Sequence, residues 1–326
     1  MSAGRGDGPL FVVGDIHGCA VELKLLLEKL PLTADSTILF VGDYIDRGPD
    51  SRQVVETILD LRKRYRVVPL MGNHEAMLGD FLDSPGSLGG GMFVYNGGSS
   101  TLASYADQLG QYSIPDEHVA FFRELKLCHD TPDYFFAHAG VPEIPLEQLD
   151  PEEHREELLW TRDMSESVYA WSKVIVHGHC QQGEPEIAAN HINVDTGCVY
   201  DGSLTAMELH TRELYRVPRQ QREAPRYLRD IRSKRRAIRF AGAIPVQIDR
   251  PEIPLHFLTV NYSEIGMYLR TLSTYGAVDL QVGESVTGFI GVHGPWRIRF
   301  WGEVVRRDHG PEGAYYAIHI KASTGM

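Results

Sequence analysis

An apolar, strand-like segment that ends in glycine beside a polar side chain recurs six times in the first 200 residues. The six segments are LFVVGD (10–15), STILFVGD (36–43), RVVPLMGN (66–73), DYFFAHAG (133–140), KVIVHGHC (173–180) and HINVDTGC (191–198). The first two are followed by stretches of helical periodicity at 21–30 and 51–65. Repeated strand and helix units with buried strands predict an α/β fold in which helices cover a parallel or mixed sheet.

The distribution of charge divides the chain into three parts. With 326 residues, 43% of them hydrophobic, the chain is long enough for two domains with buried cores. Residues 1–211 carry 14 basic and 33 acidic side chains, whereas residues 212–239 carry 11 basic and 3 acidic ones. Residues 240–326 are close to neutral, with 7 basic and 8 acidic side chains. We therefore expect an acidic first domain that repels nucleic acid polymers, a basic linker and a second domain.

Nothing in the sequence predicts membrane insertion or export. The longest apolar runs are far shorter than the roughly 20 residues that cross a bilayer, and the N-terminus lacks the apolar region of a signal peptide. The four cysteines have no CxxC spacing, which is typical of reduced thiols: Cys19, Cys128, Cys180 and Cys198. These features predict a cytoplasmic protein.

Polar side chains follow the strand-like segments. They are Asp15, His17, Asp43, Asn73, His138 and the HGH stretch at 177–179. Because ligands of open α/β sheets bind beyond the carboxyl ends of strands, we expect these side chains to converge on one crevice. Carboxylates, imidazoles and an amide oxygen suit Mn, Fe or Zn, and they are too many for one ion. The pattern predicts two ions that activate water for attack on phosphorus.

Five stretches in a fixed order resemble the signature of the PPP-type serine/threonine protein phosphatases, within the calcineurin-like metallophosphoesterases. They are GDIHG (14–18), GDYIDRG (42–48), GNHE (72–75), HAG (138–140) and GH (178–179). NGG (96–98), WTR (160–162) and DTG (195–197) are similar to the bacterial and phage members. The resemblance covers roughly residues 10–205. It implies a mixed-sheet sandwich flanked by helices and a metal-dependent phosphatase activity.

The resemblance also implies which residues bind metal. Asp15 and His17 would hold the first ion, Asp43 would bridge, and the second ion would have three ligands, Asn73, His138 and His179. His177 is a rival of His179, which we prefer because it follows the glycine of the family pattern. The family usually has threonine after this histidine, and here the next residue is Cys180.

The remaining implied roles concern phosphate. Arg47 and Arg162 would bind the phosphoryl oxygens, while His74, steadied by Asp46, would protonate the leaving oxygen. Contact of His74 with phosphate alone is an open alternative. The glycine-rich stretch SPGSLGGGMF (84–93) lacks the GK[ST] of a phosphate-binding P-loop, and we interpret it as a loop at the rim of the crevice.

The second half of the sequence has β character. Its strand-like segments are IPVQI (244–248), HFLTVNYS (256–263), GMYLRT (266–271), AVDLQV (277–282), SVTGFIG (285–291), RIRFWGEVVRRD (297–308) and AYYAIHIK (314–321). Turn residues at regular intervals between them predict a small antiparallel β-barrel. The predicted boundaries are 1–211 for the catalytic domain, 212–234 for the basic linker and 235–326 for the barrel.

Two clusters in this half resemble the signatures of the PilZ domain, which implies binding of cyclic di-GMP. Arg235 and Arg239 match RxxxR, with Arg232 and Arg236 as a competing pair. Asn261, Ser263 and Gly266 match [D/N]xSxxG. Arginine can form paired hydrogen bonds with phosphates and with the edge of guanine. The alternative is a basic linker that only contacts the acidic domain.

The sequence as a whole predicts a metal-dependent phosphomonoesterase that acts on phosphoserine or phosphothreonine in a phosphoprotein and is regulated by cyclic di-GMP. The predicted metals are two divalent transition-metal ions, with manganese as the first candidate and iron or zinc as alternatives. A symmetrical dinucleoside polyphosphate hydrolase is the second hypothesis. The third is a non-catalytic cyclic di-GMP adaptor.

Overall fold

The computed structural model describes residues 8–85, 87–107, 111–162, 164–220, 240–241, 244–250, 254–263, 266–272, 280–291, 298–310 and 313–325. The chain forms two compact units. The first unit consists of residues 1–76 and 100–223, and the second of residues 77–99 and 224–326. Segment 77–99 thus belongs to the unit that contains the C-terminal strands.

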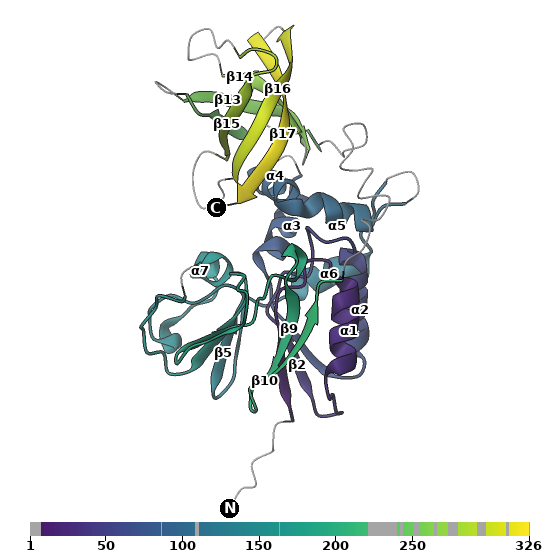
Figure 1. Ribbon diagram of the computed structural model, residues 1–326, viewed down its shortest axis with the longest axis vertical. Helices are drawn as coiled ribbons and strands as arrows, with labels where there is room; N and C mark the ends of the chain where they lie inside the picture. The colour runs from purple at the N-terminus through teal and green to yellow at the C-terminus, as the bar shows by residue number, and fades with distance from the viewer. Residues whose placement is uncertain are drawn as a thin grey trace, which may run out of the picture. The chain divides into compact units, whose positions relative to one another are not determined.

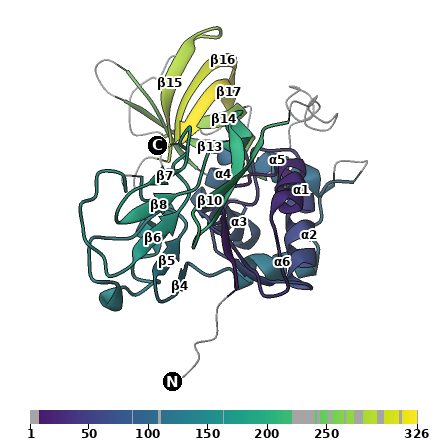
Figure 2. The ribbon, with the colours of Figure 1, turned by 60° about the horizontal axis from the view of Figure 1, so that its bottom comes forward.

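The first unit contains two five-stranded sheets. One has the strand order β10-β9-β1-β2-β3, with β1, β2 and β3 parallel, and the other has the order β4-β5-β6-β8-β7, with β5, β6 and β8 parallel (Figures 1 and 2). In the first sheet the strands are β1 (Leu10–Val13), β2 (Thr37–Phe40), β3 (Arg66–Pro69), β9 (Ser203–Glu208) and β10 (Glu213–Pro218). In the second they are β4 (Cys128–Asp130), β5 (Tyr134–Ala137), β6 (Val174–His177), β7 (Glu186–Ile187) and β8 (His191–Asn193).

The two sheets share one hydrophobic core. Its fully buried side chains come from both sheets, for example Val12 and Leu39 from the first and Phe136 and Val176 from the second. Helices α1 (Ala20–Lys29) and α2 (Ser51–Arg62) pack against the first sheet, and α7 (Arg155–Trp160) packs against the second (Figure 1). Helix α6 (Asp116–Glu124) and the short helical turns η2 (Leu146–Gln148) and η3 (Cys198–Tyr200) complete the unit.

The second unit contains a closed antiparallel barrel of six strands. The ring runs β13-β12-β15-β16-β17-β14, and pairing of β13 with β14 closes it, while β11 (Phe240–Ala241) adds to β13. The strands of the ring are β12 (Pro245–Ile248), β13 (Leu255–Ser263), β14 (Gly266–Thr271), β15 (Ser285–Ile290), β16 (Ile298–Gly310) and β17 (Gly313–Gly325). The predicted strand at 277–282 differs, because its described residues 280–282 lead into a turn at Gly283 (φ 89°).

Segment 77–99 is mostly helical. Helix α3 (Asn73–Asp83) enters it, α4 (Leu88–Phe93) and the π-helical turn η1 (Val94–Gly98) follow, and α5 (Ser99–Ser104) leaves it. The prediction of a loop was wrong for residues 88–93. Ser87 caps α4 by accepting a hydrogen bond from the amide of Gly90 (3.1 Å), and packing compensates for the low helix propensity of three glycines.

The predicted architecture is confirmed: mixed sheets flanked by helices are followed by an antiparallel β-barrel. All four cysteines are free thiols. Among the described residues, no helix has the length and apolar composition needed to cross a membrane.

Candidate metal centre

Asp43 lies between two groups of possible metal ligands. It follows β2, and its Oδ2 is 3.4 Å from His17 Nε2. Its Oδ1 is 3.5 Å from Nε2 of His138, which follows β5. One group consists of Asp43, His17 and His74, and the other of Asp43, His138 and His179, with donor atoms in each group within 4.8 Å of one another. The carboxyl ends of parallel strands from both sheets thus bring together residues that are far apart in sequence.

In the second group, acceptor atoms of neighbouring side chains face one another. His138 Nδ1 donates to the carbonyl oxygen of Val41 (2.9 Å), so its Nε2 is an acceptor. Asn73 Oδ1 faces this Nε2 at 3.0 Å, His179 Nδ1 at 3.3 Å and both oxygens of Asp43 at 3.3 Å. Acceptors that face acceptors repel one another, and a cation between them, or an Asn73 amide turned so that its nitrogen donates, removes this repulsion. These residues therefore fit a divalent cation.

The first group has the same property at His17. Its Nδ1 donates to the carbonyl oxygen of Ile45 (2.8 Å), which leaves Nε2 free to bind a cation or to accept a hydrogen bond. Burial, followed by the positive charge of Arg47, lowers the pKa of His17 to about 3. The ring is therefore neutral at pH 7, as a metal ligand must be.

Asp15 is buried beside the second group, which consists of Asp43, His138 and His179. Its two carboxylate oxygens accept hydrogen bonds from the amide of His179, at 3.2 and 3.1 Å. Burial raises the pKa of Asp15 well above its usual range, and the negative charges of Asp195 and Asp43 raise it further. A divalent cation relieves repulsion of this kind between buried carboxylates.

His74 and Asp46 form a buried pair. His74 Nδ1 is 2.6 Å from Asp46 Oδ2, and Thr101 donates to the other oxygen, Oδ1, at 2.6 Å. The amide of Asp46 in turn donates to Thr101 Oγ1 (2.8 Å). Burial, and then the charge of Arg47, lowers the pKa of His74. Thr101, at the start of α5, has no sequence signal that would have identified it.

The two arginines lie near the centre. Arg47 Nη1 donates to His17 Nε2 (2.7 Å), and its guanidinium stacks over the ring of Tyr200 at 5.5 Å. Tyr200 is 52% exposed, so this side of the centre is open to solvent. Arg162 is exposed, and its positive charge contributes, after burial and His138, to lowering the pKa of His179.

The loops that carry these residues are unusual in conformation. Five predicted site residues without a glycine's freedom have positive φ, namely His17 (46°), Asp43 (52°), Asp46 (73°), Arg47 (64°) and His179 (65°). Such strained backbone is concentrated at functional sites and needs support from its surroundings.

Glu75 supplies much of that support. Its carboxylate is buried and accepts four backbone hydrogen bonds, from Asp43 (3.0 Å), Tyr44 (2.9 Å), Ile45 (3.3 Å) and Gly72 (3.0 Å). Glu75 lies in the GNHE stretch, and its role was not predicted from the sequence. No role was predicted for Asp195, in the DTG stretch, either, although burial and then Asp43 raise its pKa to about 6.

The rival histidine lies elsewhere. His177 ends β6, its ring lies 5.5 Å from that of His191, and its Nδ1 is 3.1 Å from the carbonyl oxygen of Gly178. It is not a member of either group around Asp43.

The predicted cyclic di-GMP residues are only partly described. Arg235 and Arg239 lie outside the described residues, as does the side chain of Asn261. Ser263 and Gly266 pair at the β13–β14 turn, where Ser263 Oγ donates to the carbonyl oxygen of Gly266 (3.2 Å). Ser263 is fully buried, so its hydroxyl serves the turn.

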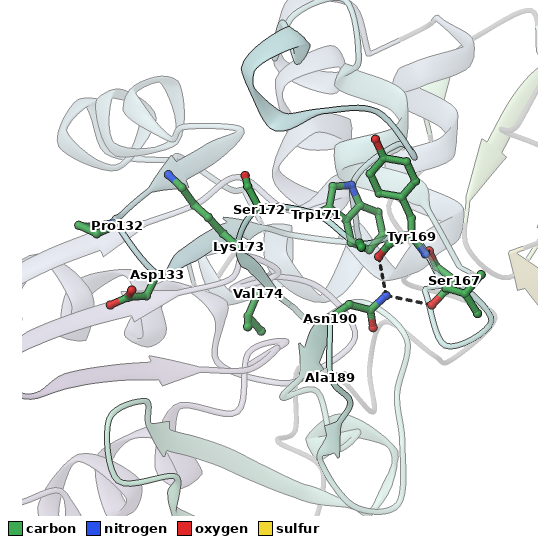
Figure 3. A pocket seen from close by; sticks show the side chains of 12 residues that line it. Pro132, Asp133, Ser167, Tyr169, Trp171, Ser172, Lys173, Val174, Ala189 and Asn190 are labelled. Atoms are coloured by element: carbon green, nitrogen blue, oxygen red, sulfur yellow. Dashed lines mark hydrogen bonds between the residues drawn. The ribbon is translucent and has the colours of Figure 1, made fainter.

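A separate pocket of about 570 Å³ lies at the edge of the second sheet, among the loops next to β6 and β8 (Figure 3). Asn190 is one of the residues that line it. The Nδ2 of Asn190 donates hydrogen bonds to the carbonyl oxygens of Ser167 (2.9 Å) and Tyr169 (3.0 Å) (Figure 3). None of the predicted site residues that the structure describes lines this pocket.

Comparisons with known proteins agree with the fold. A curated relative, bis(5'-nucleosyl)-tetraphosphatase PrpE [asymmetrical] of Anoxybacillus flavithermus, is 30% identical over 233 residues, which cover 64% of this chain and 93% of the relative. The relative of that name from a Geobacillus species is 31% identical over 239 residues, with the same coverage. A solved structure that is provisionally named a diadenosine tetraphosphatase has a TM-score of 0.52 and 24% identity, and covers 67% of this chain and 96% of its own. The family profile of the calcineurin-like phosphoesterases matches residues 8–220. This chain is therefore a member of the calcineurin-like phosphoesterase family.

Proposed function

We propose that the first unit hydrolyses phosphoserine or phosphothreonine in a phosphoprotein with the help of two divalent transition-metal ions. The observation that supports this proposal is the position of Asp43. Its two carboxylate oxygens lie next to two separate nitrogens that can bind a metal, Nε2 of His17 and Nε2 of His138. A carboxylate shared in this way suits a pair of ions that acts on phosphate esters.

The carboxylate of Asp43 would be shared by two sets of metal ligands. Asp15 and His17 would hold one ion, and the other would be held by Asn73, His138 and His179. When bound, the two ions would supply Lewis acidity for the phosphoryl oxygens and a nucleophile from water at neutral pH. Manganese is the first candidate, and iron and zinc also suit oxygen and imidazole ligands.

Side chains of the protein would handle the phosphate and the leaving group. Arg47 would exchange its hydrogen bond to His17 for phosphoryl oxygens, and Arg162 would bind the same group from the other side. His74 would protonate the leaving oxygen from Nε2, which is buried without a hydrogen-bond partner. A phosphate dianion nearby raises the pKa of His74, because negative charge favours the imidazolium form.

Hydrolysis of a dinucleoside polyphosphate is the second candidate function. The curated relatives favour it, since both are named as asymmetrical bis(5'-nucleosyl)-tetraphosphatases. This name differs from our sequence-based alternative, which was a symmetrical hydrolase.

One comparison of substrates tests both functions. The full-length protein with Mn²⁺ is given a phosphoserine peptide and, separately, diadenosine tetraphosphate, and the products are separated by anion exchange. We expect a higher kcat/KM for the peptide, with release of inorganic phosphate. A higher value for the dinucleotide would replace the proposal by the second candidate, and its products, ATP with AMP or two ADP, would give the cleavage position. Two substrates left intact by the metal-loaded protein would favour the adaptor.

We further propose that cyclic di-GMP binds the barrel and raises the phosphatase activity. The support is the resemblance of residues 235–239 and 261–266 to PilZ signatures. The stretch 212–239 carries a net charge of +8 and residues 1–211 an excess of 19 negative charges, so a charged nucleotide would compete with acidic residues for the same arginines.

Calorimetry with the full-length protein tests the sensor. Cyclic di-GMP should bind the unaltered protein and should not bind the double variant Arg235→Ala/Arg239→Ala, whose basal hydrolysis should remain measurable. The double variant Arg232→Ala/Arg236→Ala is the matched control, because it removes the same charge from the same stretch. Equal losses of binding in both variants would indicate a general charge effect, and no binding to the unaltered protein would refute the sensor.

A further inference from the structure

Segment 77–99 lies in the chain between two sets of residues of the metal centre. Asn73 and His74 form the first turn of α3, which continues to Asp83 in the second unit. Thr101, which holds Asp46, lies in the first turn of α5, directly after the segment. Helices α3 and α5 thus join the segment directly to residues of the centre.

Tyr262 of β13 holds this segment at two points. Its ring stacks on Tyr95 of η1, with 5.5 Å between centroids and 28° between planes. Its hydroxyl donates to the carbonyl oxygen of Pro85, in the connection between α3 and α4, at 2.7 Å. Tyr262 is fully buried. An aromatic pair and a buried hydrogen bond both stabilise such a contact.

Ile244, just before β12, packs where the segment has a glycine. A Cβ added at Gly91 of α4 would lie 2.0 Å from Ile244 Cδ1, so a side chain at this position would force the end of the Ile244 side chain to move. The barrel thus contacts the segment before α4, within α4 and after α4.

Tyr262 is also the residue between Asn261 and Ser263 in β13. Ser263 is fixed by its hydrogen bond to Gly266, and Asn261 pairs with Tyr268 of β14. A ligand that contacts this stretch therefore acts on the backbone that sets the position of the Tyr262 ring.

We propose that Tyr262 is a positioning residue for the metal centre: it fixes segment 77–99, and through α3 and α5 it sets the places of Asn73, His74 and Asp46. The regulatory half of this inference, in which cyclic di-GMP acts through Tyr262, rests on the proposed sensor function. The positioning half requires only the metal centre.

Three variants of the full-length protein test the positioning half. Tyr262→Ala removes the ring stack and the hydrogen bond, whereas Tyr262→Phe keeps the stack. Phe257→Leu is the matched control, because Phe257 is a fully buried ring of the same strand that packs on Tyr316 of the barrel. The measurements are kcat and KM on whichever substrate class the unaltered protein hydrolyses, the Mn²⁺ affinity without substrate, and the thermal unfolding of each variant.

A displacement of about 1 Å at a catalytic group costs about 10²-fold in rate. We expect Tyr262→Ala to lower kcat by about 10- to 100-fold with little change in KM, and to weaken Mn²⁺ binding through Asn73. Tyr262→Phe should show a smaller loss of kcat. Phe257→Leu should lower the unfolding temperature as much as Tyr262→Ala does while keeping kcat and Mn²⁺ affinity. Equal kcat and equal Mn²⁺ affinity in Tyr262→Ala and Phe257→Leu would mean that Tyr262 only stabilises the barrel core and does not position the metal centre.

The regulatory half is tested by calorimetry and kinetics on the same proteins. Cyclic di-GMP should bind both the unaltered protein and Tyr262→Ala, but should change kcat only in the unaltered protein. An equal change of kcat in both would overturn the role of Tyr262 in regulation. If cyclic di-GMP binds neither protein, the sensor proposal fails, and the kcat and Mn²⁺ comparisons still decide the positioning half.

Discussion

His74 Nδ1 donates a hydrogen bond of 2.6 Å to Asp46 Oδ2, and neither side chain is accessible to solvent. The bond fixes the tautomer of His74 and turns Nε2 toward Asp43, whose Oδ2 is 4.0 Å away. Asp46 thereby determines that Nε2 of His74 is the nitrogen that can contact a substrate.

This pair predicts that the effect of His74→Asn depends on the leaving group. Loss of a general acid costs about 10²–10⁴-fold, and it matters most for an alkoxide that needs a proton. We expect a large loss of kcat on a phosphoserine peptide, a smaller loss on p-nitrophenyl phosphate, and unchanged metal content by mass spectrometry. Equal losses on the two substrates would mean that His74 contacts phosphate without protonating the leaving oxygen.

Asp43→Asn should remove the carboxylate that the two groups share. We expect a loss of both ions and a decrease in turnover by orders of magnitude, with a folded protein by circular dichroism, because the defect is electrostatic. Treatment of the unaltered protein with a chelator should reproduce the loss, and added Mn²⁺ should restore activity only in the unaltered protein. Two ions retained per chain in Asp43→Asn would contradict the site.

His179→Ala and His177→Ala should differ in metal content. His179 belongs to the group around Asp43, whereas His177 packs on His191. We therefore expect His179→Ala to lose one ion and His177→Ala to keep both, with at most a modest change in affinity. The reverse order in metal analysis would make His177 the ligand.

Glu75→Gln should loosen the loop that carries Asp43. A carboxamide has one acceptor oxygen, so it cannot replace a carboxylate that accepts four backbone hydrogen bonds. Each buried donor left without a partner costs about 1–3 kcal/mol. Hydrogen exchange followed by mass spectrometry should show faster exchange at the amides of Asp43, Tyr44 and Gly72. Exchange as slow as in the unaltered protein would mean that the loop does not depend on Glu75.

Glu208 should make stability depend on pH below about 4.5. Burial raises the pKa of this carboxyl, but hydrogen bonds from Thr211 and His210 outweigh it and lower the pKa to about 2, from an ordinary value of 4.5. A lowered folded pKa gives stability that is present above the unfolded pKa and is lost as the pH falls toward 2. Unfolding temperatures of Glu208→Gln and the unaltered protein should differ at pH 6 and converge as the pH falls below 4.5. A difference that stays constant down to pH 3 would exclude this titration.

The sequence was sufficient to predict that the polar side chains after the strands lie close together, and insufficient to predict what supports them. Parallel strands of one sheet end at the same edge, so Asp15, Asp43 and Asn73, which follow β1, β2 and β3, could be placed together from their positions after apolar segments. Glu75, Thr101 and Tyr262 act through loops with positive φ or through contacts between distant segments, and neither leaves a periodic pattern. The helix α4 was missed for the same reason, because packing of Gly91 against Ile244 stabilises it and local propensity does not.

The membership of segment 77–99 in the barrel's unit means that the barrel is not a detachable module. The chain passes between the two units after residues 76, 99 and 223, so no single cut separates them. A shortened protein that ends at residue 220 would keep Tyr95 and Gly91 but lose Tyr262 and Ile244, and it would expose apolar surface beside its own catalytic helix. An exchange of barrel and enzyme between different relatives would therefore have to transfer both pieces of the second unit, residues 77–99 and 224–326, together.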